Sequence, residues 1–145
     1  MEKSLVKRKQ TNQEIGLYSK IPPQARELEE AVLGALLIEK DAISYVSDIL
    51  KPESFYVDAH KTIFEFCLEL FKSSKPIDML SVMEALRAES KLEEIGGGYY
   101  LSELTNKVGS SANIEYHSRI IIQKYLQREV IRICNDSITD GYEDT

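Results

Sequence analysis

The stretch from residue 113 to residue 140 most constrains what this chain can fold into, because it contains neither proline nor glycine. Placed at helical spacing, its apolar residues form three rows on different sides of one helix. The rows are Ile122, Leu126, Val130 and Ile133; Tyr116, Ile120, Ile131, Cys134 and Ile138; and Ile114, Ile121 and Tyr125. The one uniformly polar stripe consists of His117, Lys124, Arg128 and Asn135. A helix that is apolar on most sides must be buried on most sides.

This helix is the last element that the sequence predicts, so nothing later in this sequence covers its second face. Ser110, Ser111 or Asn113 can cap its start, and Gly141 can end it. Two explanations are open: the helix crosses the middle of its own domain, or it is half of an assembly surface completed by another chain or by further sequence. Its length favours the second, because such a helix spans about 40 Å at about 1.5 Å per residue, more than the width of a small globule.

The rest of the chain beyond residue 20 is typical of short helices. Helices are expected after Pro22 and Pro23, after Asp41, from about Asp58 to Lys72, after Asp78, and after the glycines at 96–98. The expected buried stripes are Ile63, Phe64, Cys67, Leu68 and Phe71 in one helix, and Leu80, Val82, Met83 and Leu86 in another. No segment shows the sustained alternation of a strand. The predicted fold is all-α, a small orthogonal helical globule followed by a long helix.

Charge separates an arm from the globule. Residues 1–20 carry five basic and two acidic side chains, whereas the remainder carries 13 basic and 22 acidic ones. An acidic globule is a poor match for nucleic acid, and the basic arm is typical of a disordered tail. We therefore divide the chain into a basic arm (1–20), a globule (21–108), a long assembly helix (109–140) and a tail (141–145). No run has the length of a membrane span and the start lacks a signal peptide, so we expect a cytoplasmic protein.

The candidate chemical groups indicate structure and no catalysis. The glycines at 96–98 follow a helical turn and lack the preceding strand and following lysine of a phosphate-binding loop, so we expect a bend. His60 is expected to be hydrogen-bonded and half-buried, and His117 to be solvated. Cys67 and Cys134 are expected to be small buried residues. The carboxylates of "ELEE" (27–30) are interpreted as helix surface. We predict no catalytic, cofactor-binding or metal-binding residue.

Several segments occur in an order that resembles the N-terminal domain of DnaB-type replicative DNA helicases, from about Ile21 to Tyr142. They are "FY…H…IF" (Phe55, Tyr56, His60, Ile63, Phe64), "PID" (76–78), "IGG..YL..L" (95–104) and "SANI" (111–114). Each is weak alone, but four in order at the right spacing are specific. Phe55, Tyr56, His60, Phe64, Gly96, Gly97 and Asn113 are interpreted as structural motif residues. One departure is Gly109, where the family often has proline, which leaves the entry into the long helix less rigid.

The resemblance implies a non-catalytic module of a hexameric helicase that unwinds DNA at the replication fork. In that family, ATP and Mg²⁺ act in a C-terminal motor domain, and the N-terminal domain is a helical globule followed by a helical hairpin. Hairpins of neighbouring subunits pair into a trimer-of-dimers collar, which also docks the helicase-binding domain of primase. By this pattern the long helix is the first half of the hairpin, and the second helix starts beyond Thr145. The resemblance gives the domain contact with DNA only through the full-length ring.

We predict that seven residues of the long helix pack against the hairpin partner or a second subunit. They are Ile114, Ile121, Ile122, Tyr125, Leu126, Val130 and Ile133. Two other classes of protein remain open from the sequence: a stand-alone helical adaptor or regulator of the helicase, and a helix-turn-helix DNA-binding protein. The acidic globule disfavours the DNA-binding class.

Overall fold

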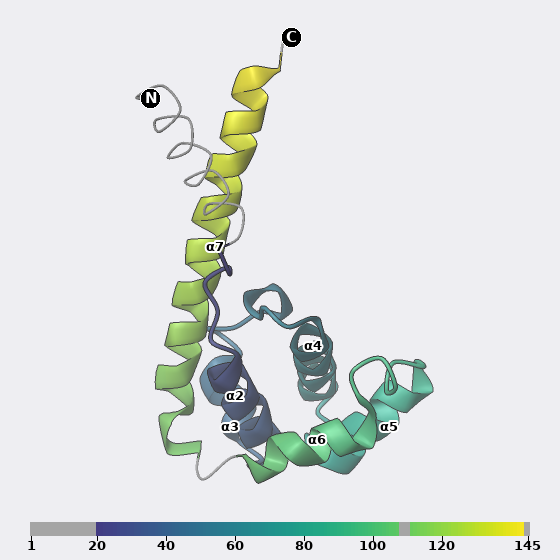
Figure 1. Cartoon of the computed structure of the whole chain (residues 1–145). Helices are drawn as coiled ribbons and strands as arrows, with labels where there is room; N and C mark the ends of the chain where they lie inside the picture. Colours follow the sequence, from purple (N-terminus) through teal and green to yellow (C-terminus); the bar gives the residue numbers. More distant parts are fainter. Residues whose placement is uncertain (1–19, 108–110, 144–145) are drawn as a thin grey trace, which may run out of the picture.

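The protein is all-α in the computed structural model, which describes residues 20–107 and 111–143 (Figure 1). None of the residues in these two ranges forms a strand. The elements in chain order are α2 (Arg26–Ile38), α3 (Ala42–Val46), η1 (Pro52–Ser54), α4 (Asp58–Lys72), α5 (Met79–Ala88), α6 (Gly97–Asn106), η2 (Ser111–Asn113) and α7 (Ile114–Tyr142). The predicted fold class is therefore confirmed. The predicted basic arm at residues 1–20 lies, except for Lys20, outside the described ranges.

Helix α2 is the centre of the globule. Every residue from Val32 to Leu37 is buried, and α2 contacts α3, α4, α5, α6 and α7. Figure 1 shows α7 along one side of α2 and α4 on the other, with α5 and α6 closing one end. A helix surrounded in this way needs an apolar surface on nearly all sides, which the sequence from Val32 to Leu37 supplies.

Helix α4 has the predicted bounds, but its buried side is wider than the predicted stripe. Ile63, Phe64 and Cys67 are buried as expected, whereas Phe71 is 43% exposed. Phe66 and Leu70 are buried as well, because α4 packs against α5 in addition to α2. Sequence periodicity alone does not show that a second helix covers this side.

Helix α5 lies at the edge of the globule and is capped as predicted. The Asp78 side chain accepts a hydrogen bond of 2.8 Å from the backbone N–H of Ser81. Val82 and Leu86 are fully buried, but Leu80 is 63% exposed, so its predicted burial is wrong. Because α5 touches its neighbours along a narrow stripe, only one side of the helix is covered.

The glycines at 96–98 form the predicted bend that starts α6. Gly96 and Gly97 have φ angles of +110° and +74°, which L-residues rarely adopt. A Cβ on Gly96 would lie 3.0 Å from the Cβ of Tyr100, so a side chain there would also collide with the new helix. The bend turns the chain back so that α6 packs against α2.

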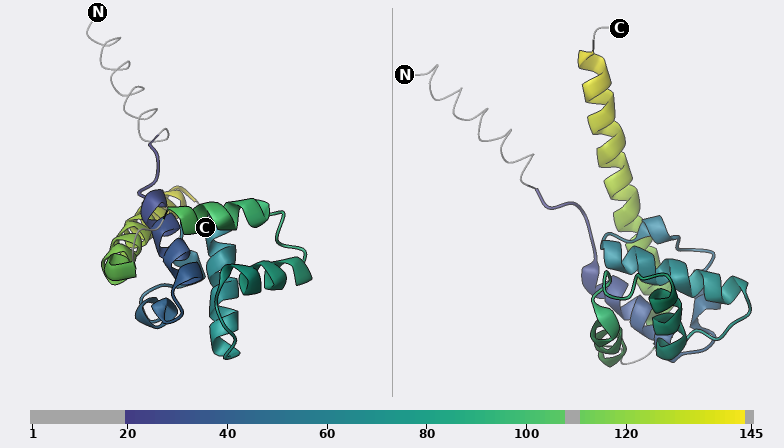
Figure 2. Two further views of the ribbon diagram at one scale, coloured as in Figure 1. Left: turned by 90° about the horizontal axis from the view of Figure 1, so that it is seen from below. Right: turned by 90° about the vertical axis from the view of Figure 1, so that its right-hand side faces the viewer.

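Helix α7 is 29 residues long and continues past Gly141, which does not end it as predicted. At about 1.5 Å per residue it spans about 43 Å. Figure 2 shows its first part against the globule and its second part projecting away from it. The chain's own globule therefore covers the first half of the helix, whereas the second half is not covered by any described element.

Candidate assembly surface

The first half of α7 is part of the globule core. Ile114, Ser118 and Ile121 are buried at successive turns, and this side of α7 packs on α2 and α3. Ser118 donates a 2.7 Å hydrogen bond to the backbone oxygen of Ile114, which satisfies its hydroxyl inside the core. The packed part of α7 thus belongs structurally with the elements before it.

Two of the seven predicted assembly residues lie in this core. Ile114 is 5% exposed and Ile121 is 1% exposed, because the chain's own α2 and α3 cover them. A side chain that is already covered in this way is not accessible to a second chain. Ile122 and Tyr125 are half-buried at the border of the globule.

The projecting half of α7 exposes a continuous apolar surface. Leu126, Val130 and Ile133 are 55%, 60% and 53% exposed. In the neighbouring row, Ile131 and Ile138 are 46% and 60% exposed, and Cys134 is exposed as well. We refer to these six residues, Leu126, Val130, Ile131, Ile133, Cys134 and Ile138, as the outer face of α7. Contiguous exposed apolar side chains of this kind mark interaction sites.

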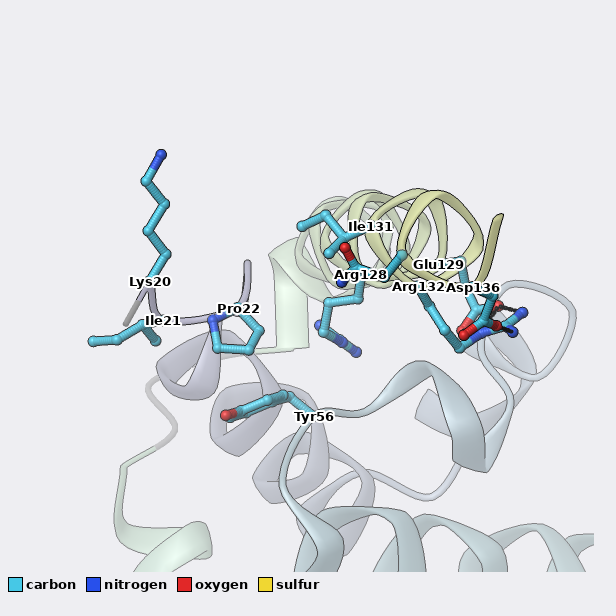
Figure 3. A pocket seen from close by; sticks show the side chains of 10 residues that line it. Lys20, Ile21, Pro22, Tyr56, Arg128, Glu129, Ile131, Arg132 and Asp136 are labelled. Carbon is cyan, nitrogen blue, oxygen red and sulfur yellow. Dashed lines mark hydrogen bonds and ion pairs between the residues drawn. The ribbon is translucent and has the colours of Figure 1, made fainter. Parts of the chain in front are cut away.

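Arg128 joins α7 to the globule at the point where the helix begins to project. Its guanidinium donates hydrogen bonds to the backbone oxygens of Pro23 (2.8 Å) and Ser54 (3.0 Å). It also lies over the rings of Tyr56 and Tyr125, at 5.4 Å and 5.8 Å from their centroids. Figure 3 shows Arg128 above Tyr56 at this junction. Arg128 had no predicted role beyond membership of the polar stripe, although its spacing of seven residues from the buried Ile121 could have placed it against the globule.

A groove of about 770 Å³ lies beside this junction. Its walls are Lys20, Ile21, Pro22, Tyr56, Arg128, Glu129, Ile131, Arg132, Asn135 and Asp136 (Figure 3). Arg132 forms ion pairs with Glu129 (2.9 Å) and Asp136 (3.0 Å) on its own helix, so its charge is neutralised locally. The hydrogen bond from Arg132 also holds the pKa of Glu129 below its usual value.

The motif residues around His60 form a buried polar network. His60 and Glu29 are 0% and 1% exposed, and the Glu29 carboxylate lies 2.8 Å from Nδ1 of His60. Because a carboxylate oxygen accepts, Nδ1 of His60 donates to Glu29, and Nε2 lies 2.5 Å from the Tyr100 hydroxyl. Burial raises the pKa of Tyr100, which keeps that hydroxyl protonated. Both ring nitrogens of His60 are thus held by side chains of the globule.

Glu29 and Glu30 correct the interpretation of "ELEE" as helix surface. Glu29 also accepts from the backbone N–H groups of Tyr56 (2.9 Å) and Val57 (3.4 Å). Glu30 is 6% exposed and pairs with Lys107 (2.7 Å) and Arg26 (3.2 Å). Burial raises the pKa of Glu30, but the hydrogen bonds from Lys107 and Arg26 outweigh it and lower the pKa overall.

The remaining motif residues also have structural positions. Phe55 and Phe64 are fully buried, with ring centroids 4.9 Å apart. Asn113 precedes α7 but its side chain makes no capping hydrogen bond. Instead, Ser111 donates from its backbone N–H and its hydroxyl to the carboxylate of Glu39, which ties the start of α7 to the end of α2. Val108 to Ser110, including the departure at Gly109, lie outside the described residues.

Cys67 is buried as predicted, whereas Cys134 is exposed, so that expectation is wrong for Cys134. Burial raises the pKa of the Cys67 thiol to about 12. Among residues 20–107 and 111–143, no group of three His, Cys, Asp or Glu side chains could hold a metal ion. In the same part of the chain, no helix is long and apolar enough to cross a membrane.

Comparison with known proteins identifies the family. Residues 21–123 match the family described as the DnaB-like helicase N-terminal domain. The chain belongs to the DnaB family. The replicative DNA helicase DnaB of Rhodothermus marinus is 50% identical to this DnaB domain over 111 residues, which are 77% of this chain and 12% of that relative.

Solved structures agree with the family. The crystal structure of the N-terminal domain of DnaB helicase from Mycobacterium tuberculosis has a TM-score of 0.82 and 34% identity, over 84% of this chain and 87% of that one. A DnaB-like replicative helicase, solved to describe its interactions with primase, has a TM-score of 0.70 and 29% identity. That match covers 80% of this DnaB domain and 27% of the helicase chain, so this domain corresponds to only a part of the longer protein.

Proposed function

We propose that this DnaB domain assembles a replicative helicase, and that a second copy of the chain covers the outer face of α7. The observation that carries the proposal is the exposure of Leu126, Val130 and Ile133, each above one half, on a helix that projects from the globule. Self-association would remove this apolar surface from water, which is the main favourable term in protein association. Pairs formed in this way are the units from which a trimer-of-dimers collar is built.

We also propose that the assembled globules dock the helicase-binding domain of primase. The support is the structural likeness to a helicase described with its interactions with primase. Binding of a purified primase helicase-binding domain to this chain, measured by calorimetry, tests this part. Absence of binding at high micromolar concentrations would contradict it.

The domain performs these roles without catalysis of its own. In the proposed full-length helicase, ATP and Mg²⁺ are used by a separate motor domain, and the ring as a whole contacts DNA. In an ATPase assay, the rate of ATP hydrolysis with this chain should therefore equal the rate measured in buffer without protein. ATP hydrolysis that copurifies with the chain and persists in the Leu126→Glu variant would contradict the proposal that the domain has no catalytic activity.

The experiment for assembly is sedimentation velocity on Leu126→Glu and Val130→Glu beside the unchanged chain. Each variant places a charge on the outer face without touching the core, so the globule should remain folded and the associated species should be lost. Leu80→Glu is the matched control, because Leu80 is similarly exposed at 63% but lies on α5. If the variants on α7 sediment as the unchanged chain does, the outer face is not the assembly surface.

A further inference from the structure

Arg128 holds together three segments that are distant in the sequence. Its two terminal nitrogens donate to backbone oxygens of Pro23, which precedes α2, and Ser54, which ends η1. Its charge also lies over the ring of Tyr56, in the segment between η1 and α4. Each of these groups belongs to the globule, whereas Arg128 belongs to α7. One side chain therefore connects the helix to both the entry segment and the η1 turn.

Arg128 lies close to the point where α7 leaves the globule. Ile121, two turns earlier, is 1% exposed and packed in the core. From Val130 to Glu143 every residue is exposed. Arg128 is therefore the last residue of α7 with a hydrogen bond to another element among the interactions described, and the exposed part of the helix begins two residues after it.

The contact requires an arginine. A planar guanidinium presents several N–H donors in a rigid fork, so it can bond two oxygens from different segments and still stack on an aromatic ring. A lysine ammonium at the same place is a point donor on a flexible stem and does not reproduce this geometry. Arg132, one turn later, shows the contrast, because its partners Glu129 and Asp136 are both on α7.

We propose that Arg128 sets the direction in which the outer half of α7 leaves the globule. Without the hydrogen bonds of Arg128, no described hydrogen bond ties the outer half of α7 to the globule, and that half can swing. The consequence for assembly rests on the proposed function: if the outer face pairs with a second copy, the direction of α7 sets the angle between the paired globules. Arg128 is a positioning residue in this proposal, and it does not itself touch the partner.

The test is a distance measurement between spin labels on α7 and on α4, in the full chain. The labels are placed at Asp140→Cys and Glu65→Cys, both exposed positions, with Cys134→Ser to remove the native exposed thiol. Residue 140 lies about 18 Å beyond Arg128 at about 1.5 Å per residue, so a swing of about 20° displaces it by about 6 Å. Labelled chain is diluted in an excess of unlabelled chain, so that only distances within one chain are recorded.

We expect one narrow distance distribution for the parent chain and for Arg132→Ala, and a broadened, shifted distribution for Arg128→Ala and Arg128→Lys. Circular dichroism confirms that each variant is folded, and Arg128→Lys decides the question if Arg128→Ala does not fold. A distribution for folded Arg128 variants that superimposes on that of the parent chain overturns the proposal. Leu126→Glu, which tests assembly, should leave this distance unchanged, so failure of the one proposal is distinguishable from failure of the other.

Discussion

Replacement of Glu29 by glutamine tests whether the buried network is a main source of stability in this domain. The Glu29 carboxylate accepts from three donors, the backbone N–H groups of Tyr56 and Val57 and the Nδ1–H of His60. Tyr56 donates to one carboxylate oxygen, whereas Val57 and His60 share the other. In glutamine, one of these two positions becomes an NH₂ group, which is itself a donor. In either orientation of the amide, at least one backbone N–H of the 56–57 turn loses its acceptor.

The expected cost follows from the burial of these groups. A hydrogen bond to a charged group contributes about 1.5–3 kcal/mol, and a buried donor left without an acceptor costs about 1–3 kcal/mol. We therefore expect Glu29→Gln to lower the free energy of unfolding by about 2 kcal/mol. At about 3–4 °C per kcal/mol for a chain of this size, the midpoint of thermal unfolding falls by about 7 °C.

The assay is urea unfolding followed by circular dichroism at pH 7, with Glu27→Gln as the matched control. Glu27 lies on the same helix but is exposed, so its substitution should cost less than about 0.5 kcal/mol. A Glu29→Gln variant as stable as Glu27→Gln would refute the reasoning, because it would show that the three hydrogen bonds make no net contribution.

Three further predictions follow from local geometry. The pKa of Glu30 in the folded protein is lowered from its usual 4.5. The ion pairs of Glu30 with Lys107 and Arg26 therefore stabilise the fold above about pH 4.5. This stabilisation is lost as the pH falls through the lower pKa of the folded state. The Glu30→Gln variant should lack this pH-dependent stabilisation. An acid unfolding transition that is the same in the variant and the parent chain would contradict the role given to the Glu30 ion pairs. Gly96→Ala should destabilise the domain by about 1–3 kcal/mol, because residue 96 has a positive φ. Gly141→Ala should stabilise α7 slightly, because a Cβ at this position meets nothing within 4 Å. Equal melting temperatures for the two variants would contradict the role of Gly96 in the bend. In the folded monomer, Cys134 should react with a thiol reagent and Cys67 should react only after unfolding, as counted by colorimetric thiol titration.

The helices and most of the core could be predicted from the sequence because they depend on local patterns. The bounds of α4, the cap at Asp78 and the bend at Gly96 follow from residue spacing, capping chemistry and backbone sterics within a few residues. The exposure of Leu80 and Phe71 could not be predicted in this way, since it depends on which neighbouring helix covers each side.

The polar contacts between elements were harder to predict than the apolar ones. Glu29 resembles the surface carboxylates around it, and only its place on the stripe with Val32 and Leu33 indicates burial. Arg128 belongs to a polar stripe, and its partners are backbone oxygens that have no signature in the sequence. Of the residues predicted to mediate self-association, Ile114 and Ile121 share the apolar character of the outer face, so periodicity could not separate the core half of α7 from the projecting half.

The measurement that tests the central claim most directly is the alkylation rate of Cys134 as a function of protein concentration. Cys134 is an exposed member of the outer face of α7, and it therefore reports on whether that face is covered. If a second copy binds there, the rate constant should fall as the concentration rises through the dissociation constant of the pair, and Leu126→Glu should remove this dependence. A rate constant that is the same at every concentration would contradict the account, since the outer face would then remain open to solvent in every species present.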